Sequence, residues 1–308
     1  MKKLFTLIAA VALLAVTVQA APKKLLVVST TTGFRHSSIS TLEKMLSQLA
    51  KDSGEFTVDF VEQPPGKPSA PKKPAPLKAD ALESAKEAYH IAEEKFNQDQ
   101  ATFNAAEANW DEALKAALQK LSPASLKNYD GVVFASTTGS SPLPLPDAPG
   151  FFEWLKAGHA FIGLHAASDM HGWPEYTEMI GGEFARHGPQ VSVDCLNQDS
   201  KHPATAALPA TWTVQLEEIY QFKSYDPAKV HELLTMDKHP EHKDQSGHFP
   251  VSWCKDYGTG KVFYTSLGHR EDVIDADPAM KDRKNSVAVS KAYQAHVLGG
   301  IEWALGLK

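Results

Sequence analysis

Hydrophobic positions along the chain follow two alternating patterns, which predict strands and helices in turn. Short apolar runs predict buried strands at 23–36, which ends in a Thr/Gly turn, and at 56–63, 129–141 and 159–167. Apolar residues at three- and four-residue spacing predict helices at 37–50 and 149–158. This alternation is typical of an α/β fold with a doubly wound, mostly parallel sheet, whose functional site lies at the carboxyl ends of the strands.

The segment 64–121 interrupts this scheme. Its first part, 64–76, is rich in Pro and Lys and predicts an extended, solvated linker. The part from 79 to 121 contains no Pro or Gly and carries a heptad stripe of large residues and alanines, which predicts a long helix. Asp99 breaks the stripe, so a helical hairpin is the alternative. The insertion is either a packing elaboration or an arm for oligomerisation or for a partner.

The second half of the chain is richer in strands. Apolar and β-branched runs predict strands at 190–197, 211–222 and 231–236, and two more within 249–267 that are joined by the tight turn DYGTGK. A closing helix is expected from Val287 to Leu305. The domain as a whole is expected to span 22–308, interrupted by the insertion.

Residues 1–20 combine two lysines, an apolar run and small residues around Ala20, which predicts a secretory signal peptide cleaved after Ala20. An uncleaved anchor is the alternative. The mature protein is therefore expected in the periplasm or outside the cell, without stable membrane insertion. Two cysteines, Cys195 and Cys254, either pair in that oxidising compartment or stay free.

The charge and the motifs of the chain exclude some classes of partner and cofactor. The chain has 31 Lys and Arg against 37 Asp and Glu and no basic patch, so nucleic acid is not an expected partner. It contains no P-loop, no G-x-G-x-x-G and no Ser-centred G-x-S-x-G motif, so no nucleotide cofactor and no serine nucleophile are expected.

Four histidines near strand ends are the candidate catalytic residues: His36, His165, His187 and His269. Neutral imidazole binds divalent metals and also acts as a general acid or base near neutral pH. Two or three of these histidines, with Asp169 or Glu218, would complete an open site for Zn²⁺ or a similar metal. Each of them alone also fits a structural, hydrogen-bonded role.

Other polar and aromatic residues near the same loops are candidates for substrate binding. They are Arg35, Asp169, Trp173, Glu218 and Tyr220. An arginine holds substrate oxygens but equally forms structural ion pairs. Aromatic rings stack on the apolar faces of sugars but also form ordinary core. A small sugar is therefore the expected ligand.

A series of motifs in order, including TTTGFRHSSI, GLHAASD, GWPEYTEMIGGEFARH and PVSWCKDYGTGKVFYTSLGHRED, resembles the ThuA-like, or trehalose-utilisation, family. The likeness covers the chain after the signal peptide except about 64–121. It implies a class I glutamine amidotransferase-like, flavodoxin-like fold. That superfamily carries a Cys at the corner after the fourth strand, where this chain has His165, so glutaminase activity is not expected.

The resemblance also implies action on trehalose-type or 3-keto disaccharides. A ketone at C3 acidifies the C2 proton, so a hydrolase or lyase with one base and one electrophilic group would break the glycosidic bond by elimination and hydration. We expect His165 as base, with His36, His187 or His269 holding a metal or polarising the ketone. The alternatives are a non-catalytic sugar-binding or scaffold protein and a metal-dependent glycan esterase.

Overall fold

The computed structural model describes residues 21–139, 142–239 and 246–308. The expected signal peptide, 1–20, lies outside these residues. Within the described part of the chain, no helix combines the length and the apolar character needed to cross a membrane.

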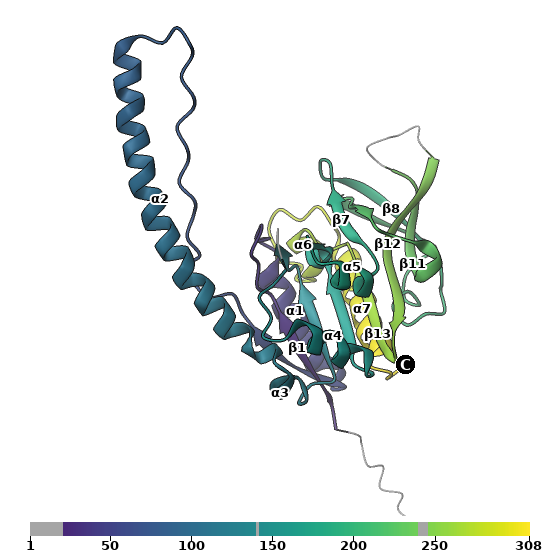
Figure 1. Cartoon of the computed structure of the whole chain (residues 1–308). Coiled ribbons are helices and arrows are strands. Elements are labelled where there is room, and N and C mark those ends of the chain that lie inside the picture. Colours follow the sequence, from purple (N-terminus) through teal and green to yellow (C-terminus); the bar gives the residue numbers. More distant parts are fainter. Residues whose placement is uncertain (1–20, 140–141, 240–245) are drawn as a thin grey trace, which may run out of the picture.

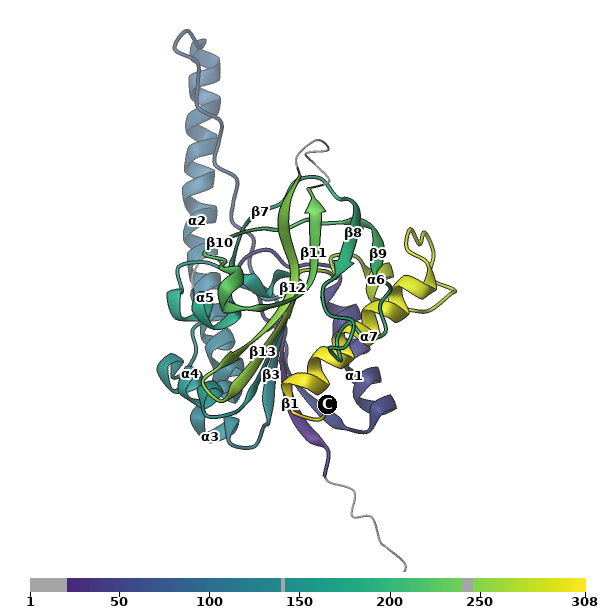
Figure 2. The same ribbon diagram turned by 90° about the vertical axis from the view of Figure 1, so that its right-hand side faces the viewer.

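A central sheet of nine strands in the order β2-β1-β3-β5-β13-β12-β11-β8-β9 organises the molecule (Figures 1 and 2). The five strands of one half run parallel: β2 Phe56–Val61, β1 Lys23–Val28, β3 Gly131–Ala135, β5 Ala160–Leu164 and β13 Gly260–Thr265. The other half is antiparallel: β12 Ser246–Tyr257, β11 His231–Lys238, β8 Val191–Asn197 and β9 Thr211–Glu217. The α/β fold class expected from the sequence is confirmed.

Two small sheets flank the carboxyl ends of the parallel strands. In one, β4 Thr138–Gly139 pairs with β6 Asp169–Met170, and in the other β7 Glu183–Arg186 pairs with β10 Gln221–Lys223. Short 3₁₀ turns occupy Gln119–Leu121, His165–Ser168 and Pro227–Lys229. The expected strand over 159–167 therefore ends at Leu164, and His165 begins a tight turn.

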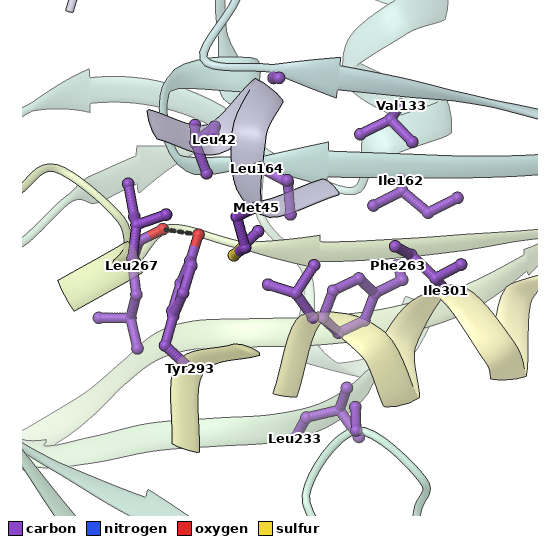
Figure 3. Packing of buried hydrophobic residues seen from close by; sticks show 14 of the residues in the cluster. Leu42, Met45, Val133, Ile162, Leu164, Leu233, Phe263, Leu267, Tyr293 and Ile301 are labelled. Atoms are coloured by element: carbon purple, nitrogen blue, oxygen red, sulfur yellow. Dashed lines mark hydrogen bonds between the residues drawn. The ribbon is translucent and has the colours of Figure 1, made fainter. Parts of the chain in front are cut away.

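Helices cover both faces of the sheet. Helices α1 Ile39–Ser53 and α7 Val287–Ala304 lie on one face, where Leu42 and Ile301 pack against sheet residues such as Ile162 and Phe263 (Figure 3). Helices α4 Ala148–Lys156 and α5 Pro174–Ile180 cover the other face with α3 Pro123–Leu126. The short helix α6 Glu271–Ile274 follows β13. Two apolar clusters thus fix the parallel strands, whose ends carry the site.

The insertion forms one continuous helix, α2 Glu83–Leu118, of 36 residues, so the helical-hairpin alternative is wrong. The absence of Pro and Gly lets it continue past Asp99. It buries only Trp110, Leu114 and Leu118. The rest projects from the domain beside the extended segment 64–82 (Figures 1 and 2), and its partly buried stripe includes Tyr89, Phe96 and Phe103. We call residues 64–118 the arm.

The two cysteines are free and buried. Cys195 lies in β8 and Cys254 in β12. The disulfide considered from the sequence is not present.

Candidate metal centre

Four residues that follow different strands converge at the carboxyl edge of the parallel sheet. His36 follows β1, His165 follows β5, His269 follows β13 and Glu218 follows β9. One ligand atom from each lies within 4.8 Å of the others, and all four side chains are buried or half-buried. We call this set the His/Glu cluster. Its donor types, three imidazoles and one carboxylate, are those that bind Zn²⁺ and similar metals.

Glu218 lies at the centre of the cluster. Its Oε2 atom is 3.8 Å from Nε2 of His36 and 3.6 Å from Nε2 of His165. Its Oε1 atom is 3.2 Å from Nδ1 of His269 and 3.5 Å from Nε2 of His187. The side chain of His187 is 38% exposed, so it stands on the solvent side of the buried carboxylate. All four histidines singled out in the sequence therefore surround one acid.

His165 occupies a strained corner. Its φ of 49° places a non-glycine residue in the left-handed region, directly after the last residue of β5. Such conformations are costly and concentrate at functional sites, as at the nucleophile elbow of hydrolytic enzymes. The ring Nδ1–H donates to the carbonyl oxygen of Ser266 at 2.7 Å, which leaves the Nε2 lone pair facing the cluster. The Tyr220 hydroxyl lies 3.2 Å from that Nε2.

Other imidazoles are oriented in the same way, through their outer nitrogens. His187 Nδ1–H donates to the carbonyl oxygen of Gly188 at 2.7 Å. His269 Nε2 lies 2.7 Å from the side-chain amide of Gln190. At His187 the outer N–H leaves the Nε2 lone pair facing the centre. At His269 the Gln190 amide nitrogen donates to Nε2, so Nδ1 carries the proton toward Glu218, and a metal at Nδ1 needs the amide turned so that its oxygen accepts from Nε2–H.

Neighbouring charges and burial set the ionisation states of the His/Glu cluster. Burial alone would raise the pKa of Glu218, but the neighbouring imidazoles of His269, His36 and His165 hold it well below its usual range. Burial, reinforced by the nearby His36, lowers the pKa of His165 well below its usual value. At neutral pH the cluster thus holds an anionic carboxylate, as metal ligation needs, and a neutral His165. Burial would lower the pKa of His269, but the hydrogen bond to Glu218 outweighs it and raises that pKa, so a metal would have to displace a proton there.

The atoms that face the centre also fit an added cation. Within the part of the chain that the structure describes, Glu218 Oε2 and His269 Nδ1 are buried without a hydrogen bond of normal geometry. Buried polar atoms are almost always satisfied, so orphaned atoms of this kind require a ligand or water. A divalent metal would satisfy both.

Of the remaining candidates from the sequence, some contact the His/Glu cluster and others do not. Tyr220 joins the cluster through His165, whereas Arg35 donates to the carbonyl oxygen of Ser29 at 2.7 Å and so braces its own loop. Asp169 is 2.8 Å from Nε2 of His171. Trp173 is buried and stacks on Tyr176 with ring centroids 5.1 Å apart. Their roles in substrate binding stay predictions.

Sequence reasoning missed several residues that support the cluster. Gln190 and the carbonyl group of Ser266 orient two of the imidazoles. Glu217 accepts hydrogen bonds from the backbone N–H groups of His269 at 2.9 Å and Gly268 at 3.2 Å, which ties the loop after β13 to β9. Burial raises the pKa of Glu217 to about 7. The acidic residue Glu217 directly before Glu218 is the one sequence signal that could have found this support. The role of the Ser266 backbone carbonyl group cannot be read from a sequence.

The fold and site define a class: a doubly wound α/β protein with a histidine and glutamate cluster at the carboxyl edge of its parallel strands. The chain belongs to the ThuA family, described as trehalose utilisation, whose model matches residues 78–304. This range includes helix α2 and leaves out β1 and His36, unlike the range expected from the motifs.

Solved structures share the fold. A ThuA-like protein from Parabacteroides merdae is 20% identical, with a TM-score of 0.57 over 93% of this chain and 91% of that one. A ThuA-like protein from Bacteroides uniformis is 16% identical, with a TM-score of 0.55 over 93% of each chain. At these identities the likeness shows the fold alone. No curated protein matches the chain.

Proposed function

We propose that this protein is an exported enzyme that cleaves the glycosidic bond of trehalose-type or 3-keto disaccharides by histidine acid/base chemistry with a divalent metal. One observation carries the proposal: three imidazoles surround a buried carboxylate at the carboxyl edge of the sheet in a member of the trehalose-utilisation family. The composition of residues 1–20 supports export.

The roles follow from position and protonation. His36, His269 and Glu218 would hold the metal, which when bound supplies a Lewis acid for the ketone oxygen of the substrate. His165 is the base, because its Ser266 contact directs the Nε2 lone pair into the site and its lowered pKa keeps Nε2 unprotonated. The Tyr220 hydroxyl, which donates to Nε2 at 3.2 Å, has to release it before His165 takes a proton. His187, at the solvent side, is the acid for the leaving group.

The bond changes balance in two stages. His165 takes the C2 proton, the electrons of the C2–H bond form the C1=C2 double bond, and the C1–O bond to the leaving sugar breaks. The leaving oxygen receives its proton from His187. In the second stage His187 takes a proton from water as the water oxygen bonds to C1, and His165 returns its proton to C2, which restores both histidines and releases the free keto sugar.

The test uses residues 21–308 expressed without a histidine tag. Bound metal is measured by mass spectrometry, and 3-keto-trehalose, trehalose and an acetylated glycan are offered to the wild type and to His165→Ala. Turnover of the keto sugar by the wild type, reduced by about two to four orders of magnitude in the variant, is the expected result. Acetate release without keto-sugar cleavage would instead establish an esterase, and sugar binding without turnover would establish a binding protein.

A further inference from the structure

Phe34 is an exposed aromatic residue at the margin of the His/Glu cluster. Its side chain is 68% exposed, and its ring meets that of His36 edge to face, with centroids 4.8 Å apart and planes at 82°. In the described part of the chain, the exposed large hydrophobic residues are Phe34, Leu77, Leu82, Ile91 and Leu307, of which Phe34 alone is aromatic. Among these exposed residues, Phe34 is the one with a ring contact to the His/Glu cluster.

The backbone beneath Phe34 is fixed although its ring is free. The Thr138 hydroxyl donates to the carbonyl oxygen of Phe34 at 2.5 Å. The backbone N–H groups of Thr32 and Gly33 donate to the carbonyl oxygen of Thr138 at 2.9 and 3.1 Å. A Cβ atom on Gly33 would lie 3.0 Å from Thr138 Oγ1, so the two loops are in close contact. The loop cannot easily withdraw the ring from water.

The arm fixes the same loop from its other side. Lys67 Nζ donates to the carbonyl oxygens of Thr31, Thr32 and Gly33 at 3.4, 2.7 and 3.1 Å. The same ammonium group lies 5.3 Å from the ring centroid of Trp110 on α2. Because these contacts fix the backbone that carries Phe34, ligand binding to the ring costs little backbone conformational entropy.

We propose that Phe34 is a stacking platform for one pyranose ring of the substrate, a sugar subsite next to the centre. This inference rests on the proposed function. A pyranose presents a face of C–H groups that packs on an aromatic face, while its hydroxyls stay in water or meet polar groups. The ring of His36 is 4.6 Å from that of His165 and adjoins Phe34, so a disaccharide whose reacting ring lies at the cluster places its second ring over Phe34.

The experiment compares Phe34→Ala, Phe34→Leu and Phe34→Trp, with Leu307→Ala as an exposed apolar control away from the cluster. KM and kcat are measured with 3-keto-trehalose, and bound metal is measured for each variant. Phe34→Ala and Phe34→Leu should raise KM by roughly three- to tenfold with kcat within about twofold, because stacking is lost. Phe34→Trp should keep the wild-type KM within about twofold, since a larger ring still stacks. Leu307→Ala and all metal contents should match the wild type.

The failures are distinguishable. If the wild type turns over the keto sugar and Phe34→Ala has an unchanged KM, the platform is refuted while the proposed function stands. If Phe34→Leu restores the wild-type KM, plain apolar contact accounts for the residue and stacking is refuted. If the wild type neither binds nor turns over the sugar, the proposed function fails and the platform fails with it.

Discussion

His165 Nε2 lies 3.6 Å from Glu218 Oε2, although β5 stands in the parallel half of the sheet and β9 is the edge strand of the antiparallel half. At the end of β9 the backbone turns at Leu216, whose φ is 54°. The next residue, Glu217, accepts a hydrogen bond from the backbone N–H of His269, which holds the end of β9 beside the loop after β13. The antiparallel half thus supplies the carboxylate for histidines that the parallel half presents.

Glu218→Gln should remove the metal while leaving the fold intact. The variant keeps the shape of the side chain but loses the one carboxylate of the His/Glu cluster. Metal affinity should therefore fall by about tenfold to a hundredfold. Glu183→Gln is the matched control, because Glu183 contacts His171 at 2.6 Å outside the cluster. Titration with Zn²⁺ followed by calorimetry measures both. Equal affinities would show that the cluster is not the metal site.

Lys67→Met should loosen the loop that carries Phe34. The variant keeps the length of the side chain but loses three contacts from a charged donor, so the free energy of unfolding should fall by about 1–3 kcal/mol. Amide hydrogen exchange at 31–36 should accelerate, and Lys67→Arg should restore part of the protection. Lys72→Met, at an exposed position of the same segment, is the control. Unchanged amide exchange at 31–36 in Lys67→Met would show that Lys67 does not hold this loop.

Trp110→Ala should detach the arm without unfolding the domain. Trp110 is one of three buried residues of α2, and its indole N–H donates to the carbonyl oxygen of Pro64 at 3.1 Å. Its loss should cost about 3 kcal/mol of arm docking and expose residues 64–109 to limited proteolysis. Ile91→Ala, at a 61% exposed position, should change stability by less than about 0.5 kcal/mol. Proteolysis at wild-type rates would show that other contacts hold the arm.

Asp272 should make stability depend on acid. Burial would raise its pKa, but hydrogen bonds from the backbone N–H groups of Asn285 and Lys284, and from Arg270, lower it to about 2. Because the folded pKa lies below the unfolded one, the carboxylate stabilises the fold above about pH 4, and this contribution is lost as the pH falls toward 2.

Asp272→Asn should therefore lower the free energy of unfolding by about 2 kcal/mol at pH 7, with a difference that shrinks below about pH 4. Denaturant unfolding across this range, with the exposed Asp80→Asn as control, measures the effect. A difference that is constant with pH would show that packing, and not charge, explains it.

Local sequence patterns predicted the parallel half of the sheet well, because its strands are apolar runs and the covering helices α1, α4 and α7 have regular apolar spacing. The short helices α3 and α5 were not predicted. They also placed His36 and His165 at strand ends, which parallel topology must bring to one edge. They could not place Glu218 at the centre, since its position depends on pairing between distant antiparallel strands. Gln190 is likewise an ordinary polar residue until the fold brings it to His269.

The arm shows the same limit. The stripe from Tyr89 to Trp110 predicted a helix that needs a partner, but spacing does not identify the partner. The structure places the preceding Pro-rich segment beside the helix (Figure 1). Lys67 of that segment lies over the Trp110 ring. A long helix within 79–121 was predicted beside a hairpin alternative, and α2 spans Glu83–Leu118. Its projection from the domain was not predicted, because that depends on where its three buried residues meet the domain.

The arm leaves the domain after β2 and returns beside the point of departure, where Lys120 donates to the carbonyl oxygen of Phe60 at 2.7 Å. Because exit and return are neighbours, a short loop would close the gap and leave the register of β1, β2 and β3 unchanged. A single insertion or deletion in the gene would therefore add or remove the whole arm. The loop 31–33 below the site would then lose the Lys67 contacts, so loss of the arm would reach the site through that loop.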